Sequence, residues 1–384
     1  MRLLLAGGGH SNVEVLRRFA LKPEPGVEIT LVSPDALTPY SGMLPGLIAG
    51  HYSVADSHVD LPPLAQWAGA RFVQDRAVAL DVVSKTLTLA DGSSESFDSL
   101  SIDIGSVPGM TQVPGAREHA VGVRPVAAFL AMWERLQAEV AVGTVRGIAV
   151  VGGGAGGVEL LLAMQQRLRV TLGDAAPRFA LITDRPHLLP EHAPAVRARF
   201  GRLLVAREVV LHLDSGVVAV EDGAVIVTQQ RRIAADRIVW VTSAAAQPWL
   251  AASGLACDER GFLLLDEHLR STSHPFVFAA GDCATQVAHP RPKSGVFAVR
   301  QGPPLVANLR RSLHDQPLVR FVPQRHALSL ISTGDRHAIA SRGPWMIEGD
   351  WVWRWKDRID RRFLARYRPP AAGDVPRKPA GNAI

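Results

Sequence analysis

The sequence predicts an α/β fold made of two doubly wound halves and a small C-terminal α+β region. Glycine-rich turns lie at 6–12 (Ala-Gly-Gly-Gly-His-Ser-Asn) and 151–157 (Val-Gly-Gly-Gly-Ala-Gly-Gly), and each follows an apolar strand-like run and opens a helical pattern. Such a turn lets the backbone approach a pyrophosphate, which the helix N-terminus holds with free N–H groups and partial positive charge. Residues 273–282 add the element Ser-His-Pro-Phe-Val-Phe-Ala-Ala-Gly-Asp, which selects flavin for one of the two sites. Together the three signals predict two Rossmann-like dinucleotide-binding domains.

Length and composition fit an ordinary globular protein. The chain has 384 residues, 47% hydrophobic and 20% charged, which predicts two or three domains. Its two cysteines, Cys257 and Cys283, form no C-x-x-C pair, so the sequence predicts neither a disulfide framework nor a metal site. We expect a reducing, cytoplasmic location. We also expect a soluble or peripheral protein, because there is no signal peptide and no apolar stretch long enough to span a bilayer.

The formal charge of +6 is unevenly placed. Residues 342–384 hold ten Lys or Arg against five Asp or Glu, a net of +5. Such a segment faces anionic lipid, nucleic acid or solvent. The rest of the chain is close to neutral, which argues against nucleic acid as the main partner.

The first half begins with a βαβ unit: a strand over 2–6, a helix over 11–21 and a strand over 27–32. Asn12 stands where the third glycine of the fingerprint is usual. Ser33 ends the second strand, where an acidic residue often binds a ribose hydroxyl, and its own hydroxyl can bond the ribose without charge assistance. The alternative is that Ser33 only ends a strand before a proline turn.

The second half repeats the unit with a strand over 148–151, a helix opened by 154–157 and a strand over 179–183. Its fingerprint is complete, because Gly152, Gly154 and Gly157 supply all three glycines. Further expected elements are a hairpin region over 209–213, 217–220 and 224–228, a buried strand over 238–241, a strand over 276–280 that rejoins the first sheet, a helix over 297–313, and strands over 327–332 and 337–341.

Further motifs carry a resemblance to a known family. They are Ser33-Pro34, Thr38-Pro39-Tyr40-Ser41-Gly42-Met43-Leu44-Pro45, Gly157-Val158-Glu159 and Ala280-Gly281-Asp282. On these motifs the chain resembles the pyridine-nucleotide disulfide oxidoreductase superfamily, in the branch of type II NADH:quinone oxidoreductases. More narrowly, five segments covering 9–11, 40–46, 291–293, 295–304 and 353–357 resemble the flavoprotein found alone or fused ahead of selenophosphate synthetase (selenide, water dikinase).

The resemblance implies a glutathione-reductase-like two-domain flavoprotein fold that binds FAD and uses NADH or NADPH as co-substrate. The residues it assigns to FAD are Gly7, Gly9, His10, Ser11, Ser33, Pro45, Gly105, Asp282 and Gln301. Within this set, Asp282 accepts a hydrogen bond from the ribityl chain, and the helix entered near Gln301 aims its N-terminus at the flavin pyrimidine oxygen. Lys293 either lies near the same ring or is solvated.

The residues that the resemblance assigns to NAD(P)H are Gly152, Gly154, Gly157, Asp184 and Arg185. Glu159 is the best candidate for a polar group where flavin and nicotinamide meet; the alternative is a helix-surface glutamate. Thr183 stands where NADH-preferring relatives usually carry Glu. Either Asp184 binds the ribose diol or Arg185 meets a 2′-phosphate, so the choice between NADH and NADPH stays open.

These patterns divide the chain into four parts. We expect a discontinuous FAD-binding domain over 1–112 and 265–315, an NAD(P)H-binding domain over 113–264, a C-terminal cap over 316–368 and a disordered tail over 369–384.

The cysteines bear on the route of the electrons. Disulfide reductases of the superfamily use a paired C-x-x-C or C-x4-C, which is missing here, and Cys283 reads as a small apolar filler. Electrons must then leave the flavin directly for a quinone-like or other diffusible acceptor. The alternatives are an oxidoreductase acting on a selenium or sulfur compound, and a flavin-binding sensor or interaction protein with negligible turnover.

The segment 351–367 bears on partners. Trp351, Trp353 and Trp355 alternate as in a strand, and an apolar stripe then recurs every four residues among arginines; its members are Trp355, Ile359, Phe363 and Tyr367. The stripe suits a helix in the interface at the inner face of the cytoplasmic membrane. It suits equally a helix docked on the protein's own core, or on a second subunit in a homodimer.

Overall fold

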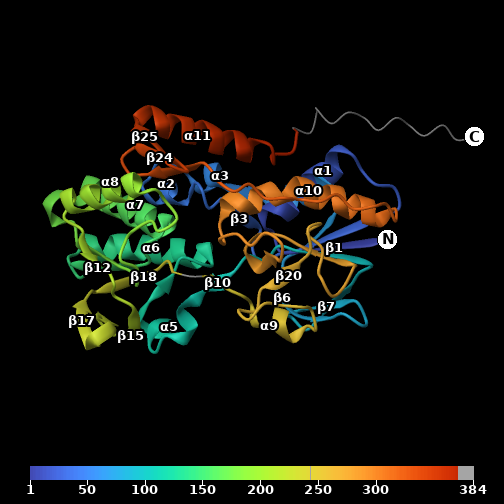
Figure 1. The fold of residues 1–384 in the computed structure, drawn as a ribbon, viewed down its shortest axis with the longest axis horizontal. Helices are drawn as coiled ribbons and strands as arrows, with labels where there is room; N and C mark the ends of the chain where they lie inside the picture. The colour runs from blue at the N-terminus through green and yellow to red at the C-terminus, as the bar shows by residue number, and fades with distance from the viewer. Residues whose placement is uncertain (243, 371–384) are drawn as a thin grey trace, which may run out of the picture.

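The computed structural model describes residues 1–242 and 244–370. Two five-stranded parallel sheets stand side by side, and a long C-terminal helix runs across the top of the molecule in Figure 1. The predicted α/β fold with two Rossmann-like halves is confirmed. From residue 371 onward, the predicted tail lies outside the described residues.

The elements have the following bounds. The strands are β1 Arg2–Ala6, β2 Glu28–Val32, β3 Leu37–Pro39, β4 His58–Asp60, β5 Arg71–Val73, β6 Ala77–Asp81, β7 Thr86–Leu89, β8 Ser94–Ser96, β9 Ser99–Ile102, β10 Val107–Pro108, β11 Val121–Gly122, β12 Gly147–Val151, β13 Arg178–Ile182, β14 Val210–His212, β15 Val217–Glu221, β16 Ala224–Val227, β17 Arg231–Ala234, β18 Arg237–Trp240, β19 Ala244–Ala245, β20 Leu263–Leu265, β21 Val277–Ala279, β22 Ala284–Gln286, β23 Ser329–Ser332, β24 Ala338–Arg342 and β25 Trp345–Gly349. The α-helices are α1 His10–Leu21, α2 Leu44–Ile48, α3 Val54–Ser57, α4 Leu61–Trp67, α5 Ala116–His119, α6 Val126–Ala141, α7 Ala155–Leu172, α8 Pro194–Ala206, α9 Pro248–Ala252, α10 Gly295–Leu313 and α11 Asp350–Ala365.

The first sheet has the order β21-β9-β1-β2-β5, with all strands parallel. Its central strand β1 is buried on both faces, which is why its sequence is a continuous apolar run rather than an alternating one. Strand β21 pairs with β9, so the predicted return of the chain to this sheet is confirmed. In Figure 1, α1 and α10 lie above the sheet, while β6 and β7 lie below it.

The second sheet has the order β11-β18-β12-β13-β14 and is also parallel. The expected hairpin region is confirmed for 217–220 and 224–228, because β15 and β16 pair antiparallel. The run 209–213 does not belong to it, because β14 pairs parallel with β13 at the sheet edge. A short apolar run does not distinguish an edge strand from a hairpin arm. Strand β17 completes the antiparallel sheet β15-β16-β17.

Two short passages connect the halves. Strand β10 leads out of the first half (Figure 1). Strand β19 leads back toward it, and the two pair antiparallel. The chain therefore crosses between the sheets through two adjacent strands.

The C-terminal region is an antiparallel sheet, β23-β24-β25, followed by α11. The expected strand-like alternation of Trp351, Trp353 and Trp355 is wrong, because all three lie in α11. The predicted stripe is also divided. Residues four apart in a helix rotate by about 40° per step, so the stripe turns from exposed Trp355 and Ile359 to buried side chains further along. Those buried members are Phe363, 7% exposed, and Tyr367, 4% exposed.

A buried ion pair fixes α11 to the first half. Lys356 Nζ lies 2.6 Å from Asp360 Oδ2 and donates to the Gly42 carbonyl oxygen at 2.5 Å. Burial and the charge of Asp360 raise the pKa of Tyr40, and the Tyr40 ring stacks on Phe363 with centroids 4.6 Å apart. Burial raises the pKa of Asp360 despite the opposing charge of Lys356. One face of α11 is thus docked on the protein's own core.

We predict that Lys356→Met lowers the free energy of unfolding by about 3 kcal/mol, because it leaves the Asp360 carboxylate buried and unpaired. Adding Asp360→Asn should recover part of the loss, since no buried charge then remains. Chemical denaturation followed by tryptophan fluorescence measures both. Arg354→Met, on the exposed side of α11, is the matched control and should stay within about 0.5 kcal/mol of the parent. Equal losses for Lys356→Met and Arg354→Met would contradict this account of the pair.

Candidate active site

The first glycine turn lies between the ends of β1 and β9. Gly7 has φ +94°, and a Cβ atom there would stand 2.3 Å from the Asp103 carbonyl oxygen. A Cβ at Gly9 would stand 2.2 Å from Asp103 Cγ. Only glycine therefore fits this approach, and α1 begins directly after Gly9, which provides no side-chain cap. The first N–H groups of the helix lie at the carboxyl end of the sheet, where those of Ser11 and Asn12 donate to the Asp103 carboxylate.

Asn12 replaces the third glycine and bridges the strand ends instead. Its Nδ2 donates to the carbonyl oxygens of Ala6, at 3.2 Å, and Gly7, at 2.9 Å. Ser101 Oγ donates to Asn12 Oδ1 at 2.7 Å. Asn12 is fully buried, and each of its polar side-chain atoms has a partner.

Ser11 and Ser33 lie beside the same turn. Ser11 Oγ donates to the Ala298 carbonyl oxygen at 3.0 Å, which connects α1 to α10. Ser33 Oγ donates to the Asp35 carbonyl oxygen at 3.0 Å, so its hydroxyl closes a local turn.

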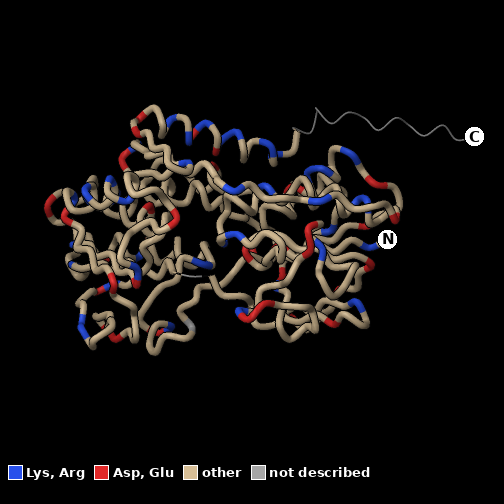
Figure 2. The backbone as a smooth tube through the Cα atoms, in the orientation of Figure 1, with Lys and Arg blue, Asp and Glu red and all other residues tan. Residues whose placement is uncertain are grey.

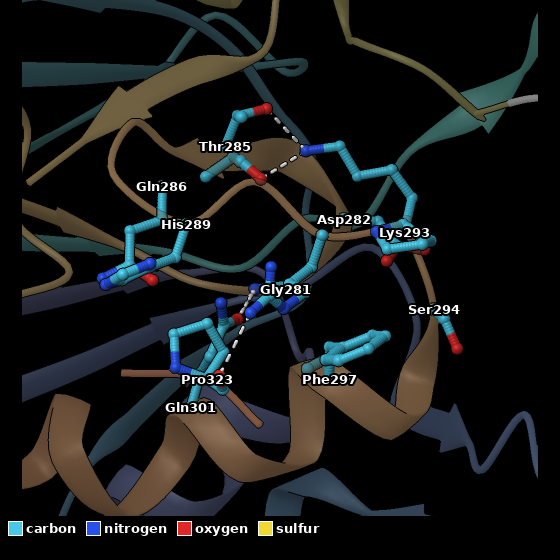
Figure 3. A pocket seen from close by; sticks show the side chains of 14 residues that line it. Gly281, Asp282, Thr285, Gln286, His289, Lys293, Ser294, Phe297, Gln301 and Pro323 are labelled. Carbon is cyan, nitrogen blue, oxygen red and sulfur yellow. Dashed lines mark hydrogen bonds between the residues drawn. The ribbon is translucent and has the colours of Figure 1, made fainter. Parts of the chain in front are cut away.

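Asp282 and Gln301 meet at the Ala-Gly-Asp element after β21. Gln301 Oε1 accepts from the Gly281 N–H at 2.6 Å (Figure 3). Helix α10 begins at Gly295, so Gln301 lies within the helix rather than at its N-terminus. Asp282 is 7% exposed, and one of its oxygens lies 2.9 Å from Arg124 NH1.

Lys293 belongs to the same pocket (Figure 3). Its ammonium group donates to the Ala284 carbonyl oxygen and, at 2.9 Å, to Thr285 Oγ1. The same group lies 4.2 Å from the centroid of the Phe262 ring. Burial lowers the pKa of Lys293, and protein groups rather than solvent satisfy its donors.

An aromatic cluster joins His10, Tyr40 and Phe363. The His10 ring centroid is 5.3 Å from that of Tyr40 and 5.8 Å from that of Phe363. Burial lowers the pKa of His10 to about 4, so the ring is neutral at pH 7. Its Nε2 is buried and has no hydrogen-bond partner among the described residues. Pro45 lies in α2, on the segment that follows Tyr40.

The second glycine turn has the tighter packing. A Cβ at Gly157 would stand 1.9 Å from the Gly152 carbonyl oxygen, so the third glycine is required for α7 to approach β12. Gly154 is the N-cap of α7, again without a side-chain cap. At the end of β13, Asp184 and Arg185 are both exposed, with an oxygen and a nitrogen 3.8 Å apart. Both are thus available to a ligand at this edge.

Glu159 lies where α7 meets the C-terminal region. Its Oε1 accepts from the Ser332 N–H at 2.7 Å. Burial raises the pKa of Glu159 to about 7, and Lys356 and the Ser332 amide only partly oppose this rise.

Two functional candidates were missed from the sequence. Arg124 bonds Ser106 Oγ and pairs with Asp282 across a long sequence separation, which no local pattern announces. Asp103 directly follows the buried strand β9, and this position of an acidic residue was a signal that could have been used.

Residues 1–302 match the family described as pyridine nucleotide-disulphide oxidoreductase. The chain belongs to this family. Among its relatives, the NADH dehydrogenase-like protein YutJ of Bacillus subtilis is 24% identical over 372 residues, which cover 92% of this chain and 98% of that protein. Demethylphylloquinone reductase NdbB of Synechocystis is 25% identical and covers 74% of this chain and 72% of its own. The structure of NDH2 from Plasmodium falciparum in complex with NADH aligns with a TM-score of 0.81 at 14% identity, over 95% of this chain and 97% of that one.

The family match confirms the predicted superfamily, and the relatives confirm its NADH dehydrogenase-like branch. In this pyridine nucleotide-disulphide oxidoreductase, two features of the first half fit an FAD site. The glycine turn after β1 admits no Cβ, and the buried Nε2 of His10 beside it has no partner among the described residues.

Both cysteines of this family member are free. Cys283 is fully buried, and its thiol donates to the Ala280 carbonyl oxygen at 3.1 Å. Burial raises the pKa of Cys283 to about 12, which leaves a neutral thiol of low nucleophilicity. Cys257 is partly exposed, and burial also raises its pKa.

We predict that the double variant Cys257→Ser with Cys283→Ala keeps flavin reduction and acceptor turnover within about threefold of the parent. Stopped-flow absorbance and steady-state assays check this, with the FAD content of each preparation measured first. A hundredfold loss with FAD still bound would show that a thiol carries the electrons.

Proposed function

We propose that this protein takes hydride from NADH or NADPH onto FAD and passes the electrons directly to a quinone-like or other diffusible acceptor. The class of FAD-dependent NAD(P)H oxidoreductase is confirmed by the family match and by relatives named as NADH dehydrogenase-like and quinone-reducing proteins. The observation that carries the proposal is the pair of glycine turns, each after the central strand of its own parallel sheet, in a chain whose cysteines are free.

The proposal assigns the nucleotides as the sequence suggested. FAD lies on the first half (1–112 and 265–315), NAD(P)H lies on the second (113–264), and residues 316–368 cover the space where they meet. When bound, the flavin supplies the redox chemistry. The chain supplies the α1 and α7 N-termini for the two pyrophosphates and Asp282 as acceptor for a ribityl hydroxyl.

Glu159 and the cap have roles in the same proposal. Glu159 holds or releases a proton near the flavin, supported by its raised pKa and its contact with Ser332. The buried aromatic cluster of His10, Tyr40 and Phe363 packs the cap against the first half beside the proposed flavin site. Two relatives are named for quinones: NdbB, and the Arabidopsis NAD(P)H-ubiquinone oxidoreductase C1.

A second candidate is an oxidoreductase for a selenium or sulfur compound, in line with the narrower resemblance to the flavoprotein fused ahead of selenophosphate synthetase. Segments that carry that resemblance meet in space, since His10 contacts Tyr40 and Lys356 bonds Gly42. An acceptor panel that contains quinones, selenium compounds and sulfur compounds distinguishes the two candidates.

We predict that anaerobic mixing with NADH or NADPH bleaches the bound flavin rapidly, at a rate above turnover with the best acceptor. Comparison of the two nucleotides in a stopped-flow instrument settles cofactor choice. If Arg185 contacts the 2′-phosphate, Arg185→Ala should weaken the binding of NADPH and leave the binding of NADH unchanged. Bound flavin that neither nucleotide reduces would contradict the proposal and favour a flavin-binding sensor.

We also propose that the exposed side of the cap contacts the membrane. Five large apolar side chains are exposed there: Trp345, Ile347, Trp351, Trp355 and Ile359. Lys and Arg residues are spaced along α11 in Figure 2, which suits an anionic lipid surface. No helix among the described residues is long and apolar enough to cross a bilayer, so the contact would be peripheral. A homodimer formed through the same face is the competing arrangement.

We predict that the protein co-sediments with anionic vesicles and that added salt weakens the binding. Replacing Trp351, Trp355 and Ile359 together by Ser should abolish co-sedimentation while the flavin spectrum persists. Val83→Ser with Val142→Ser, two exposed apolar residues elsewhere, is the matched control. A triple variant that changes oligomeric mass in light scattering, with no vesicle binding by the parent, would show a dimer face instead.

A further inference from the structure

A buried carboxylate occupies the N-terminus of α1. Asp103 is 3% exposed, and its Oδ2 accepts from the Ser11 N–H at 2.8 Å and from the Asn12 N–H at 3.4 Å. Its carbonyl oxygen accepts from the Gly9 N–H at 3.1 Å. Backbone donors at the pyrophosphate end of the helix are therefore bonded to an acidic residue of the chain itself.

The carboxylate is enclosed by both glycine elements of the first half. A Cβ at Gly9 would stand 2.2 Å from Asp103 Cγ, and a Cβ at Gly281 would stand 2.5 Å from Asp103 Oδ1. The contact is thus built into the backbone of β9, of the first turn and of the Ala-Gly-Asp element. Asp103 lies at the same helix end as the expected phosphate groups.

The titratable side chains that face Asp103 do not compensate its charge. They are Asp282 and the neutral thiol Cys283, while His10 beside them is uncharged at neutral pH. Arg124 is paired with Asp282, and no Lys or Arg within residues 1–242 and 244–370 forms an ion pair with Asp103. Burial raises the pKa of Asp103 to about 7, with a further rise from Asp282 and opposition from the Ser11 and Asn12 amides.

We propose that Asp103 takes up one proton from solvent when FAD binds, so that its carboxyl group donates a hydrogen bond toward the pyrophosphate. An ionised Asp103 would instead place another negative charge beside the phosphates, next to Asp282. This inference rests on the proposed FAD site and adds to it a proton linkage at a named residue.

The linkage fixes the sign of the pH dependence. Because FAD binds the protonated form, bound FAD raises the Asp103 pKa above its value in the free protein. The affinity for FAD is then constant well below pH 7 and falls by up to about tenfold per pH unit above it. The fall ends when the pH passes the pKa of the bound state.

The test is FAD binding by the full-length apoprotein, followed through quenching of flavin fluorescence from about pH 6 to about pH 9. The Kd should rise by at least about tenfold over this range. Calorimetry in two buffers of different ionisation enthalpy should show net uptake of a proton per FAD near pH 8. Asp103→Asn should flatten the pH profile, abolish the uptake and bind FAD more tightly than the parent at high pH. Asp222→Asn, in the exposed turn between β15 and β16, is the control and should keep the parent's profile.

The outcomes separate this inference from the proposed function. A parent protein that binds FAD with a pH-independent Kd and no proton uptake overturns the inference alone, as does an Asp103→Asn variant that keeps the parent's slope. If Asp103→Asn does not fold, calorimetry on the parent decides. Failure of the apoprotein to bind FAD at any pH overturns the proposed function itself.

Discussion

The contact between the Gly7–Gly9 turn and the end of β9 is the constraint on which the rest of the structure depends. With Cβ distances of 2.3 Å and 2.2 Å to Asp103, no residue but glycine lets β1, β9 and α1 meet in this way. The contact places the α1 N-terminus, the Ala-Gly-Asp element and the Tyr40 segment around one point at the carboxyl end of the sheet. A doubly wound sheet binds its ligands at this edge.

The second half has the same kind of glycine turn between strand and helix, but the charged groups around it differ. Its complete fingerprint brings Gly157 against Gly152, and its helix end has no carboxylate comparable to Asp103 among the described residues. The glycine turn of the first half thus lies beside buried acidic groups, whereas the second half presents exposed Asp184 and Arg185. A permanently held cofactor and an exchanging co-substrate would make these different demands, the first on buried contacts and the second on access.

Local patterns in the sequence predicted most of the sheet framework. The runs 2–6 and 148–151 are central strands, and the Phe276 segment returns to the first sheet as expected, because apolar runs and glycine turns are local signals. The failed predictions have two causes, tertiary contacts and helix geometry. The 209–213 run became a parallel edge strand, and the C-terminal stripe divided between core and surface because a four-residue spacing drifts around a helix.

The glycines of the site were predictable from local patterns, but the residues that reach it through tertiary contacts were not. The glycines lie where the fingerprints required them. Arg124, however, pairs with Asp282 from a distant part of the chain. The role of Asp103 follows only from its hydrogen bond to the N-terminus of α1. The assignment of the remaining residues to FAD and NAD(P)H stays a prediction.

The central claim is that flavin alone stores the electrons between NAD(P)H and the acceptor. Anaerobic titration of the purified holoprotein with NADH or NADPH, whichever reduces it, tests this claim most directly, because it counts electrons per FAD. A flavin without a redox disulfide takes one two-electron equivalent per FAD, with the spectrum of oxidised flavin lost at that point. Consumption of two equivalents per FAD would contradict the account and require a second two-electron acceptor in the protein.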